Sequence, residues 1–338
     1  MTWFVACLSQ ELGRKRPLAR VVDGARLALF RDGAGRPGAL LDRCPHRNAP
    51  LSCGRVRDGL LECCYHGWRF DGEGACRLVP GLVDGEAERR ARRAGAYAVA
   101  EHDGFVWVAA SDGAGDGAGD RPPPFRFPRV DDRAYATVRR HVTLPAGLYA
   151  CIENALDVPH TAFLHGGLFR GGRAPVEIEV VVRSVAGGVE AEYIGEPRPE
   201  GLIGRILAPE GGVLAHHDRF LLPSIAQIEY RLGENHLVDT VAFTPVSEHV
   251  TELYAAITFH LRLPHAPVRA AVTPVVNRIL SQDARVLRRQ SETIAAFGGE
   301  RFASTELDVL GNHIRKLLDG GSAGLAGAGG ERRIRMRV

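Results

Sequence analysis

The sequence predicts an α+β protein built from two domains. Residues 1–110 hold short runs of strand-forming residues separated by glycine turns, which is typical of an all-β domain. Residues 111–124 are rich in Gly and Asp and end in three prolines, a composition typical of a linker or a long surface loop. Residues 125–318 hold many further strand candidates with helices before and after them, which predicts an α+β domain with an antiparallel sheet.

The order of elements follows from the pattern of apolar residues. In the first domain, residues 27–30 and 104–108 are strand candidates next to Gly turns. In the second domain, the stretch from Gly147 to about His165 reads as a helix followed by a loop. The further strand candidates are 138–144, 176–185, 189–194, 213–222, 225–232, 236–245 and 252–263, and the late helices are expected at 267–280 and 282–297.

The composition is that of an ordinary globular protein. The 338 residues are 45% hydrophobic and 25% charged with a formal net charge of +3, which gives no reason to expect a nucleic acid or an acidic membrane as partner. No apolar run approaches the roughly 20 residues that span a bilayer, and the start lacks a signal peptide, so we expect a cytoplasmic protein. Residues 319–338 form a low-complexity basic tail that we expect to be mobile.

Cysteine and histidine gather in one part of the first domain. Four of the seven cysteines lie within about twenty residues, which in a reducing compartment indicates metal binding before disulfides. Cys44 and His46 form one short pair, and Cys63 and His66 form a second pair after sixteen intervening residues. Cys64 competes with Cys63, but the two-residue gap to His66 favours Cys63 and leaves Cys64 as a small buried residue.

Two kinds of metal site use two Cys and two His. A structural zinc site takes all four in one tetrahedron, but zinc fingers pair Cys with Cys and His with His across short gaps. Here each short pair mixes the two residue types. In a Rieske [2Fe–2S] centre one iron takes two Cys and the other takes two His, so the mixed pairs would each supply one ligand to each iron.

A second constellation lies at the start of the second domain. Asn154, Asp157 and His160 are spaced by three residues and would share one face of a helix. His165 follows five residues later, roughly 140° round a regular helix, so the helix must distort or end for both rings to meet one metal. Pro159 provides a means for such a break.

Two His and one carboxylate form the facial triad of non-haem Fe(II) oxygenases. The carboxylate should come from elsewhere in the domain, and Asp283 opens the late amphipathic helix. Its alternative role is a helix N-cap. Asn154 is either close to the metal or a structural hydrogen-bonder. His216 and His217 are adjacent on a strand and face opposite sides, so they cannot both bind one metal, and a structural role is the simpler reading.

Both constellations resemble the Rieske non-haem iron oxygenases. The first motif, Cys-Pro-His-Arg from residue 44, Pro-Leu-Ser from 50 and Cys-x-Tyr-His-Gly-Trp-x-Phe-Asp-x-x-Gly from 63, resembles their Rieske domain over nearly all of residues 1–110. The second motif, Asn-x-x-Asp-x-x-His-x4-His followed by a late Asp, resembles their catalytic domain. Size and spacing are similar to those of the shorter, α-only members, such as the vanillate demethylase and dicamba monooxygenase group.

The resemblance implies a fold, cofactors and roles. The second domain would have a helix-grip, START-like fold, with Fe(II) on His160, His165 and Asp283. Asn154 and Asp157 would be catalytic residues. Asp157 would bridge to a cluster-ligand histidine of the neighbouring subunit, either His46 or His66 with His66 preferred, in a head-to-tail homotrimer.

The implied activity is an O2-dependent hydroxylation or oxidative O- or N-dealkylation of a small organic substrate. No G-x-G-x-x-G follows a strand, so electrons from NAD(P)H would arrive through a ferredoxin, a flavin reductase or both. Two other classes stay open: a Rieske electron carrier, which would need only residues 1–110, and a zinc-bound START-like module that binds a ligand without redox chemistry.

Overall fold

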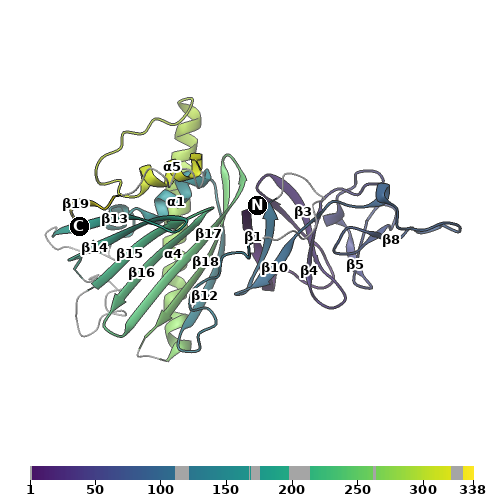
Figure 1. Cartoon of the computed structure of the whole chain (residues 1–338), viewed down its shortest axis with the longest axis horizontal. Helices are drawn as coiled ribbons and strands as arrows, with labels where there is room; N and C mark the ends of the chain where they lie inside the picture. Colours follow the sequence, from purple (N-terminus) through teal and green to yellow (C-terminus); the bar gives the residue numbers. More distant parts are fainter. Residues whose placement is uncertain are drawn as a thin grey trace. The chain divides into compact units, whose positions relative to one another are not determined.

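The computed structural model describes residues 2–110, 122–166, 168, 176–197, 214–261, 264–320 and 330–338. The chain divides into two compact units (Figure 1). The first comprises Met1–Arg126 together with Thr244–Ser247, and the second comprises Phe127–Phe243 and Glu248–Val338. Most of the expected linker, residues 111–121, lies outside the described residues. Within the part that the structure describes, no helix is both long and apolar enough to cross a membrane.

The first unit is built from three small antiparallel sheets, and its regular helices within the described residues are single 3-10 turns. Two clusters of fully buried apolar side chains fill it, one around Leu27 and Val106 and the other around Phe30 and Phe70. The sheets are β1 (Thr2–Leu8), β11 (Phe105–Ala110) and β10 (Val99–His102); β2 (Leu18–Val22), β3 (Ala25–Arg31), β4 (Pro37–Leu41) and β9 (Ala96–Tyr97); and β5 (Arg55–Arg57), β6 (Leu60–Glu62), β7 (Arg69–Phe70) and β8 (Cys76–Leu78).

The second unit is an eight-stranded sheet with helices packed against it (Figure 1). Along the sheet the strands are β12 (Ala136–Leu144), β18 (Val250–His260), β17 (Asn235–Ser247), β16 (Ile225–Leu232), β15 (Leu214–Leu221), β14 (Gly188–Ile194), β13 (Glu177–Val185) and β19 (Arg332–Arg337). The helices are α1 (Leu148–Leu156), α2 (His160–Leu164), α4 (His265–Ala296) and α5 (Gly311–Gly320). The predicted α+β class, with a β first domain and an antiparallel second domain, is confirmed.

The core of the second unit lies between the sheet and its helices. Phe220, Ala226 and Val241 form one row across β15, β16 and β17, so their side chains share a face of the sheet. They are buried in the same apolar cluster as Ile152 of α1 and Leu287 of α4. The long helix therefore covers the same sheet face as α1.

Helix α4 corrects the prediction of two late helices. It runs without interruption for 32 residues, about 48 Å, and keeps Pro274 inside. The expected break near residue 281 is wrong because nothing there stops a helix: the hydroxyl of Ser281 donates to the carbonyl of Asn277 at 2.7 Å, within the helix. Asp283 consequently lies in the middle of a helix, and its alternative role as an N-cap is excluded.

The end of the chain corrects the expectation of a mobile basic tail. Residues 321–329 lie outside the described residues, but Arg332–Arg337 forms β19, which pairs antiparallel with β13. Ile334 and Met336 are buried in the core, and the arginines between and around them are exposed. This alternation of apolar and charged side chains is the pattern of an edge strand, which the basic composition concealed.

The role of β19 can be tested with Ile334→Ala. Truncating this buried side chain should lower the free energy of unfolding by about 2–4 kcal/mol, because it leaves a cavity against the sheet. Arg337→Ala, on the exposed face of the same strand, is the control and should change stability by less than about 0.5 kcal/mol. Denaturant unfolding measures both, and equal stability of the two variants would show that β19 does not belong to the core.

Candidate functional site

The two Cys/His pairs lie in two loops with the same backbone geometry. In the first, the N–H of Asn48 donates to the carbonyl of Cys44 and the N–H of Cys44 donates to Ala49. In the second, Gly67 and Trp68 make the equivalent bonds with Cys63. The fourth residue after each cysteine, Asn48 or Gly67, has a positive φ, which Asn and Gly tolerate best. Each loop therefore presents one Cys and one His from a closed turn.

The cysteine side chains of this site are shielded from solvent. Cys44 and Cys63 are only 2% and 3% exposed. Burial, together with the neighbouring thiol of Cys63, raises the pKa of Cys44 to about 11. Two buried thiols side by side suit metal coordination, since a bound metal supplies the positive charge that deprotonates them.

The histidine side chains form a second pair. The rings of His46 and His66 meet edge to face with centroids 4.5 Å apart, and Trp68 stacks on His46 at 4.6 Å. The Nδ1 atom of His46 is buried, and no described residue hydrogen-bonds it, as expected of an atom kept for a metal. The exposed ring of Tyr65 lies against His66.

The four residues do not converge on one point. In the part of the chain that the structure describes, no set of three ligand atoms from these residues lies close enough for a single ion. A tetrahedral zinc site needs all four around one ion, whereas a two-iron cluster takes the thiols and the imidazoles on separate irons. The arrangement fits the cluster and does not fit the single zinc ion.

Cys64 lies apart from this arrangement. It is exposed, not buried as we expected, and its thiol faces the carbonyl of Pro50 at 3.9 Å. Sequence reasoning also missed Asp42, whose carboxylate accepts from the backbone N–H and the hydroxyl of Ser52, both at 2.6 Å. These two bonds tie the ends of the first loop together. An Asp just before the loop and a Ser just after it could have predicted this contact from the sequence.

The second site depends on a break between two helices. Helix α1 ends at Leu156, and Asp157 has extended φ and ψ angles. Helix α2 begins at His160 and ends at Leu164, so His165 lies just beyond it. A helix therefore ends between the two histidines, as we expected, at Leu164. Pro159 does not cause this end, because it lies before His160, between α1 and α2. Asn154, Asp157 and His160 are therefore not on one continuous helix, contrary to our expectation.

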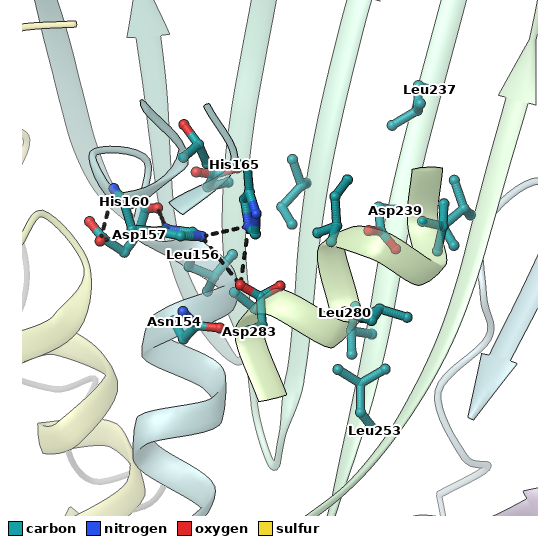
Figure 2. A pocket seen from close by; sticks show the side chains of 18 of the residues that line it. Asn154, Leu156, Asp157, His160, His165, Leu237, Asp239, Leu253, Leu280 and Asp283 are labelled. Atoms are coloured by element: carbon teal, nitrogen blue, oxygen red, sulfur yellow. Dashed lines mark hydrogen bonds and ion pairs between the residues drawn. The ribbon is translucent and has the colours of Figure 1, made fainter. Parts of the chain in front are cut away.

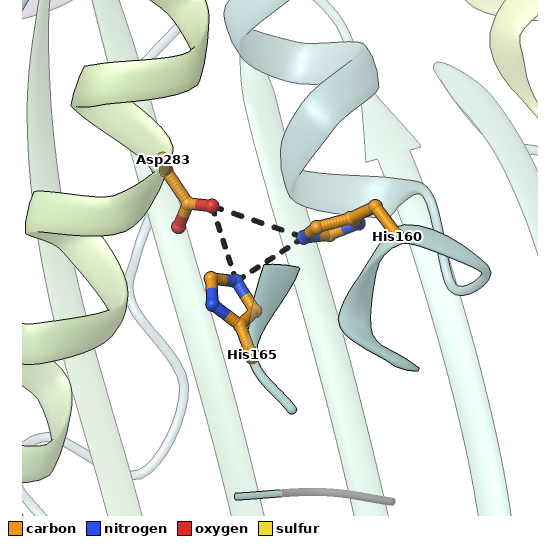
Figure 3. A group of neighbouring side chains, drawn as sticks. All are labelled: His160, His165 and Asp283. Carbon is orange, nitrogen blue, oxygen red and sulfur yellow. Dashed lines mark hydrogen bonds and ion pairs between the residues drawn. The ribbon is translucent and has the colours of Figure 1, made fainter. Parts of the chain in front are cut away.

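Helix α2, the residue that follows it and helix α4 bring three ligand atoms together (Figure 3). The Nε2 atoms of His160 and His165 are 3.3 Å apart. Oδ1 of Asp283 lies 3.1 Å from Nε2 of His165 and 3.8 Å from Nε2 of His160. Ligand atoms that each lie about 2.1 Å from one metal are separated by about 3 to 4 Å, so the three fit a single ion.

Hydrogen bonds fix the orientation of both rings. Nδ1 of His165 donates to Oε1 of Gln282 at 3.0 Å, and Nδ1 of His160 donates to the backbone carbonyl of Asp157. With these protons on Nδ1, both Nε2 atoms present lone pairs to Oδ1 of Asp283, which is buried and accepts no hydrogen bond from the described residues. Three electron-rich atoms facing one point are suited to hold a cation. Gln282 was missed, although it precedes Asp283.

Carboxylates surround His160. The carboxylate of Asp157 accepts the backbone N–H of His160 at 3.3 Å and lies 3.6 Å from its Nδ1. Burial lowers the pKa of His160, but the hydrogen bond and charge of Asp157 and the charge of Asp283 outweigh it and raise that pKa. Burial and the charges of Asp157 and Asp308 raise the pKa of Glu153 to about 7. The site is thus rich in negative charge.

A pocket opens beside the three ligands (Figure 2). Most of its lining is aliphatic or aromatic, from the sheet, α1 and the middle of α4, for example Leu253, Ile257 and Leu280. Asn154 and Asp157 line the same pocket. A small apolar compound in this space would lie next to the metal ligands, away from bulk water.

The two adjacent histidines do not reach the three ligands. His216 is completely buried and bonds Glu196 at 2.5 Å and Asp218 at 2.9 Å. His217 points to the other side of the strand, where its Nδ1 is 3.9 Å from Glu190.

Comparison with known proteins matches both parts of the chain. Residues 2–89 match the Rieske [2Fe-2S] domain, and residues 146–321 match the vanillate O-demethylase oxygenase C-terminal domain. The chain is 27% identical to the vanillate O-demethylase oxygenase subunit of Pseudomonas sp. (strain HR199 / DSM 7063), over 94% of this chain and 93% of that protein. It is 37% identical to the dicamba O-demethylase oxygenase component of Stenotrophomonas maltophilia, over 48% of this chain and 46% of that protein.

Solved structures are similar along nearly the whole chain. A crystal structure of dicamba monooxygenase bound to 3,6-dichlorosalicylic acid has a TM-score of 0.80 at 25% identity and covers 97% of this chain and 98% of that one. Several curated relatives, in contrast, align over less than half of their own length.

The choice between Cys63 and Cys64 can be tested by substitution. Cys63→Ala should abolish the red-brown colour and the Rieske-type EPR signal of reduced protein, because it removes a buried ligand. Cys64→Ala, its exposed neighbour, is the matched control and should keep about two cluster irons per chain. Loss of the signal only in the Cys64 variant would contradict the assignment.

Proposed function

The chain belongs to the Rieske non-haem iron oxygenases, in the vanillate demethylase and dicamba monooxygenase group, and on this premise we propose that it is the oxygenase component of a system that oxidises a small aromatic or cyclic compound. The reaction is a hydroxylation or an oxidative O- or N-dealkylation. The observation that carries the proposal is the convergence of His160, His165 and Asp283 at the side of an apolar pocket.

The cofactors are a Rieske [2Fe–2S] cluster and a mononuclear non-haem iron. Cys44, His46, Cys63 and His66 would hold the cluster, and His160, His165 and Asp283 would hold the iron. When bound, the cluster supplies single electrons and the iron supplies dioxygen activation.

The protein's own groups orient the ligands and exclude water. The carbonyl of Asp157 and the amide oxygen of Gln282 keep the Nδ1 protons in place, so each Nε2 stays available. The apolar pocket walls hold an aromatic ring and keep bulk water from the reacting carbon. Asn154, which lines the pocket, is placed to hydrogen-bond a ligand close to the iron.

Electrons come from a separate protein. Because the sequence has no G-x-G-x-x-G after a strand, it offers no dinucleotide site of its own. A ferredoxin, a flavin reductase or both would deliver electrons that originate from NAD(P)H. This division of labour agrees with the words "oxygenase component" in the name of one relative.

We also propose a homotrimer in which Asp157 links neighbouring subunits. Its side chain is 27% exposed at the break between α1 and α2, and His66 is exposed beside the cluster cysteines. A carboxylate that holds His160 on one side can accept a hydrogen bond from His66 of the next subunit on the other. A head-to-tail contact of this kind closes into a ring.

The activity is tested with the iron-loaded protein and an NADH-dependent reductase. Aromatic methyl ethers should produce substrate-dependent O2 uptake. His160→Ala and Asp283→Ala should lose this uptake and keep the cluster EPR signal, because they remove only ligands of the second metal. Asp319→Ala, an exposed Asp on α5, is the control for a lost carboxylate and should retain activity. An active Asp283→Ala enzyme with full iron occupancy would mean that another carboxylate is the ligand.

The subunit bridge is tested with Asp157→Asn, which keeps the shape and removes the charge. Both metals should stay bound and the cluster should stay reducible, while turnover falls by at least about tenfold, the usual effect of losing a group that orients a metal ligand. Mixed trimers of Cys63→Ala and His160→Ala chains should regain part of the activity. Proven mixed trimers without activity would show that electrons pass within one chain.

A further inference from the structure

Two acidic side chains lie in the same row of the sheet. Asp218 on β15, Ile228 on β16 and Asp239 on β17 are consecutive cross-strand partners, so all three point to one face. All three line the pocket beside the iron ligands. The two carboxylates belong to strands separated by one other strand, so their Cα atoms are about 10 Å apart.

The charge of Asp218 is balanced within the protein. His216 lies between Asp218 and Glu196 and is stacked between Tyr193 and Tyr230, with ring centroids 4.4 Å and 4.2 Å away. Burial lowers the pKa of His216, but the charges of Asp218 and Glu196 outweigh it and raise that pKa to about 9. At neutral pH His216 is therefore a cation, and Asp218 has no need of a partner from a ligand.

No described residue offsets the charge of Asp239 in this way. Its strand neighbours on the same face are Leu237 and Val241, and its cross-strand neighbour on β16 is Ile228. Its Oδ1 atom is buried, and no described residue hydrogen-bonds it. Burial raises the pKa of Asp239 to about 7. A buried polar atom without a partner is costly, so a polar group of a ligand is the natural partner.

The other residues of the pocket indicate which charge the partner group of the ligand should carry. Among the described residues that line it, the only nitrogen bases are His160 and His165, whose Nε2 atoms face the metal, and there is no Lys or Arg. Away from the iron ligands, a substrate carboxylate in this space would meet Asp218 and Asp239, and no described Lys or Arg of the lining would pair with it. In Figure 2 the carboxyl group of Asp239 stands apart from the iron ligands, among the apolar side chains of the pocket.

We propose that Asp239 determines substrate specificity by accepting a hydrogen bond from an N–H or O–H group of a neutral or cationic substrate, and that the pocket discriminates against aromatic carboxylates. This inference rests on the proposed oxygenase function. It separates the chain from relatives whose printed names refer to vanillate or to a salicylic acid, which are carboxylates.

The test is equilibrium binding to the iron-loaded, anaerobic full-length protein without reductase. Three probes share one ring: 3-methoxybenzyl alcohol, 3-methoxybenzylamine and 3-methoxybenzoate. Calorimetry should show the alcohol and the amine binding at least about tenfold more tightly than the benzoate, as expected for a hydrogen bond to a charged group. Asp239→Leu should remove this preference, and Asp239→Asn should weaken the amine more than the alcohol.

The control is Asp319→Asn, an exposed Asp on α5, which should leave all three affinities unchanged. Iron content and the thermal midpoint establish that the Asp239 variants are folded. Equal or tighter binding of the benzoate, no measurable binding of the alcohol and the amine, or an unchanged preference in Asp239→Leu would each overturn the proposal. Because binding needs no turnover, a failure of the oxygenase function would appear separately, as absent O2 uptake with intact binding preference.

Discussion

The two helix ends around the histidines are the constraint on which the iron site depends. If one helix ran through both residues, His160 and His165 would be roughly 140° apart around it, and their rings could not meet. Because α2 begins at His160 and already ends at Leu164, His165 lies outside the helix, and the two Nε2 atoms come within 3.3 Å of each other. The carboxylate of Asp157 closes the turn before α2 through the N–H of His160, so the same residue shapes the backbone and stands beside the ligand.

The long helix supplies the other half of the site. Gln282 and Asp283 are consecutive in the middle of α4, and one holds the ring of His165 while the other faces both Nε2 atoms. A helix interior fixes these two side chains better than a helix end, which frays. The packing of Leu287 in the core, one turn further on, anchors this part of α4 against the sheet.

Local spacing in the sequence predicted much of both sites, because each loop or turn is formed by residues close in the chain. The mixed Cys/His pairs lie in matching turns, and His160 and His165 meet as required. The errors concern features set by distant residues. The exposure of Cys64, the continuity of α4 and the pairing of the basic C-terminal strand depend on which surfaces other elements cover, and spacing does not encode this.

The distribution of charge links the iron site to the pocket. The acidic groups next to His160 and His165 are offset by a metal cation when one is bound. The charge of Asp218, further along the pocket, is offset by the neighbouring side chain of His216. Asp239 is the carboxyl group of this pocket for which the described residues provide neither. A substrate that brings a donor or a positive charge would complete the balance, and it would do so while its ring fills the apolar space beside His160 and Asp283. The same group that is costly in the empty pocket thus becomes the source of selectivity when the pocket is filled.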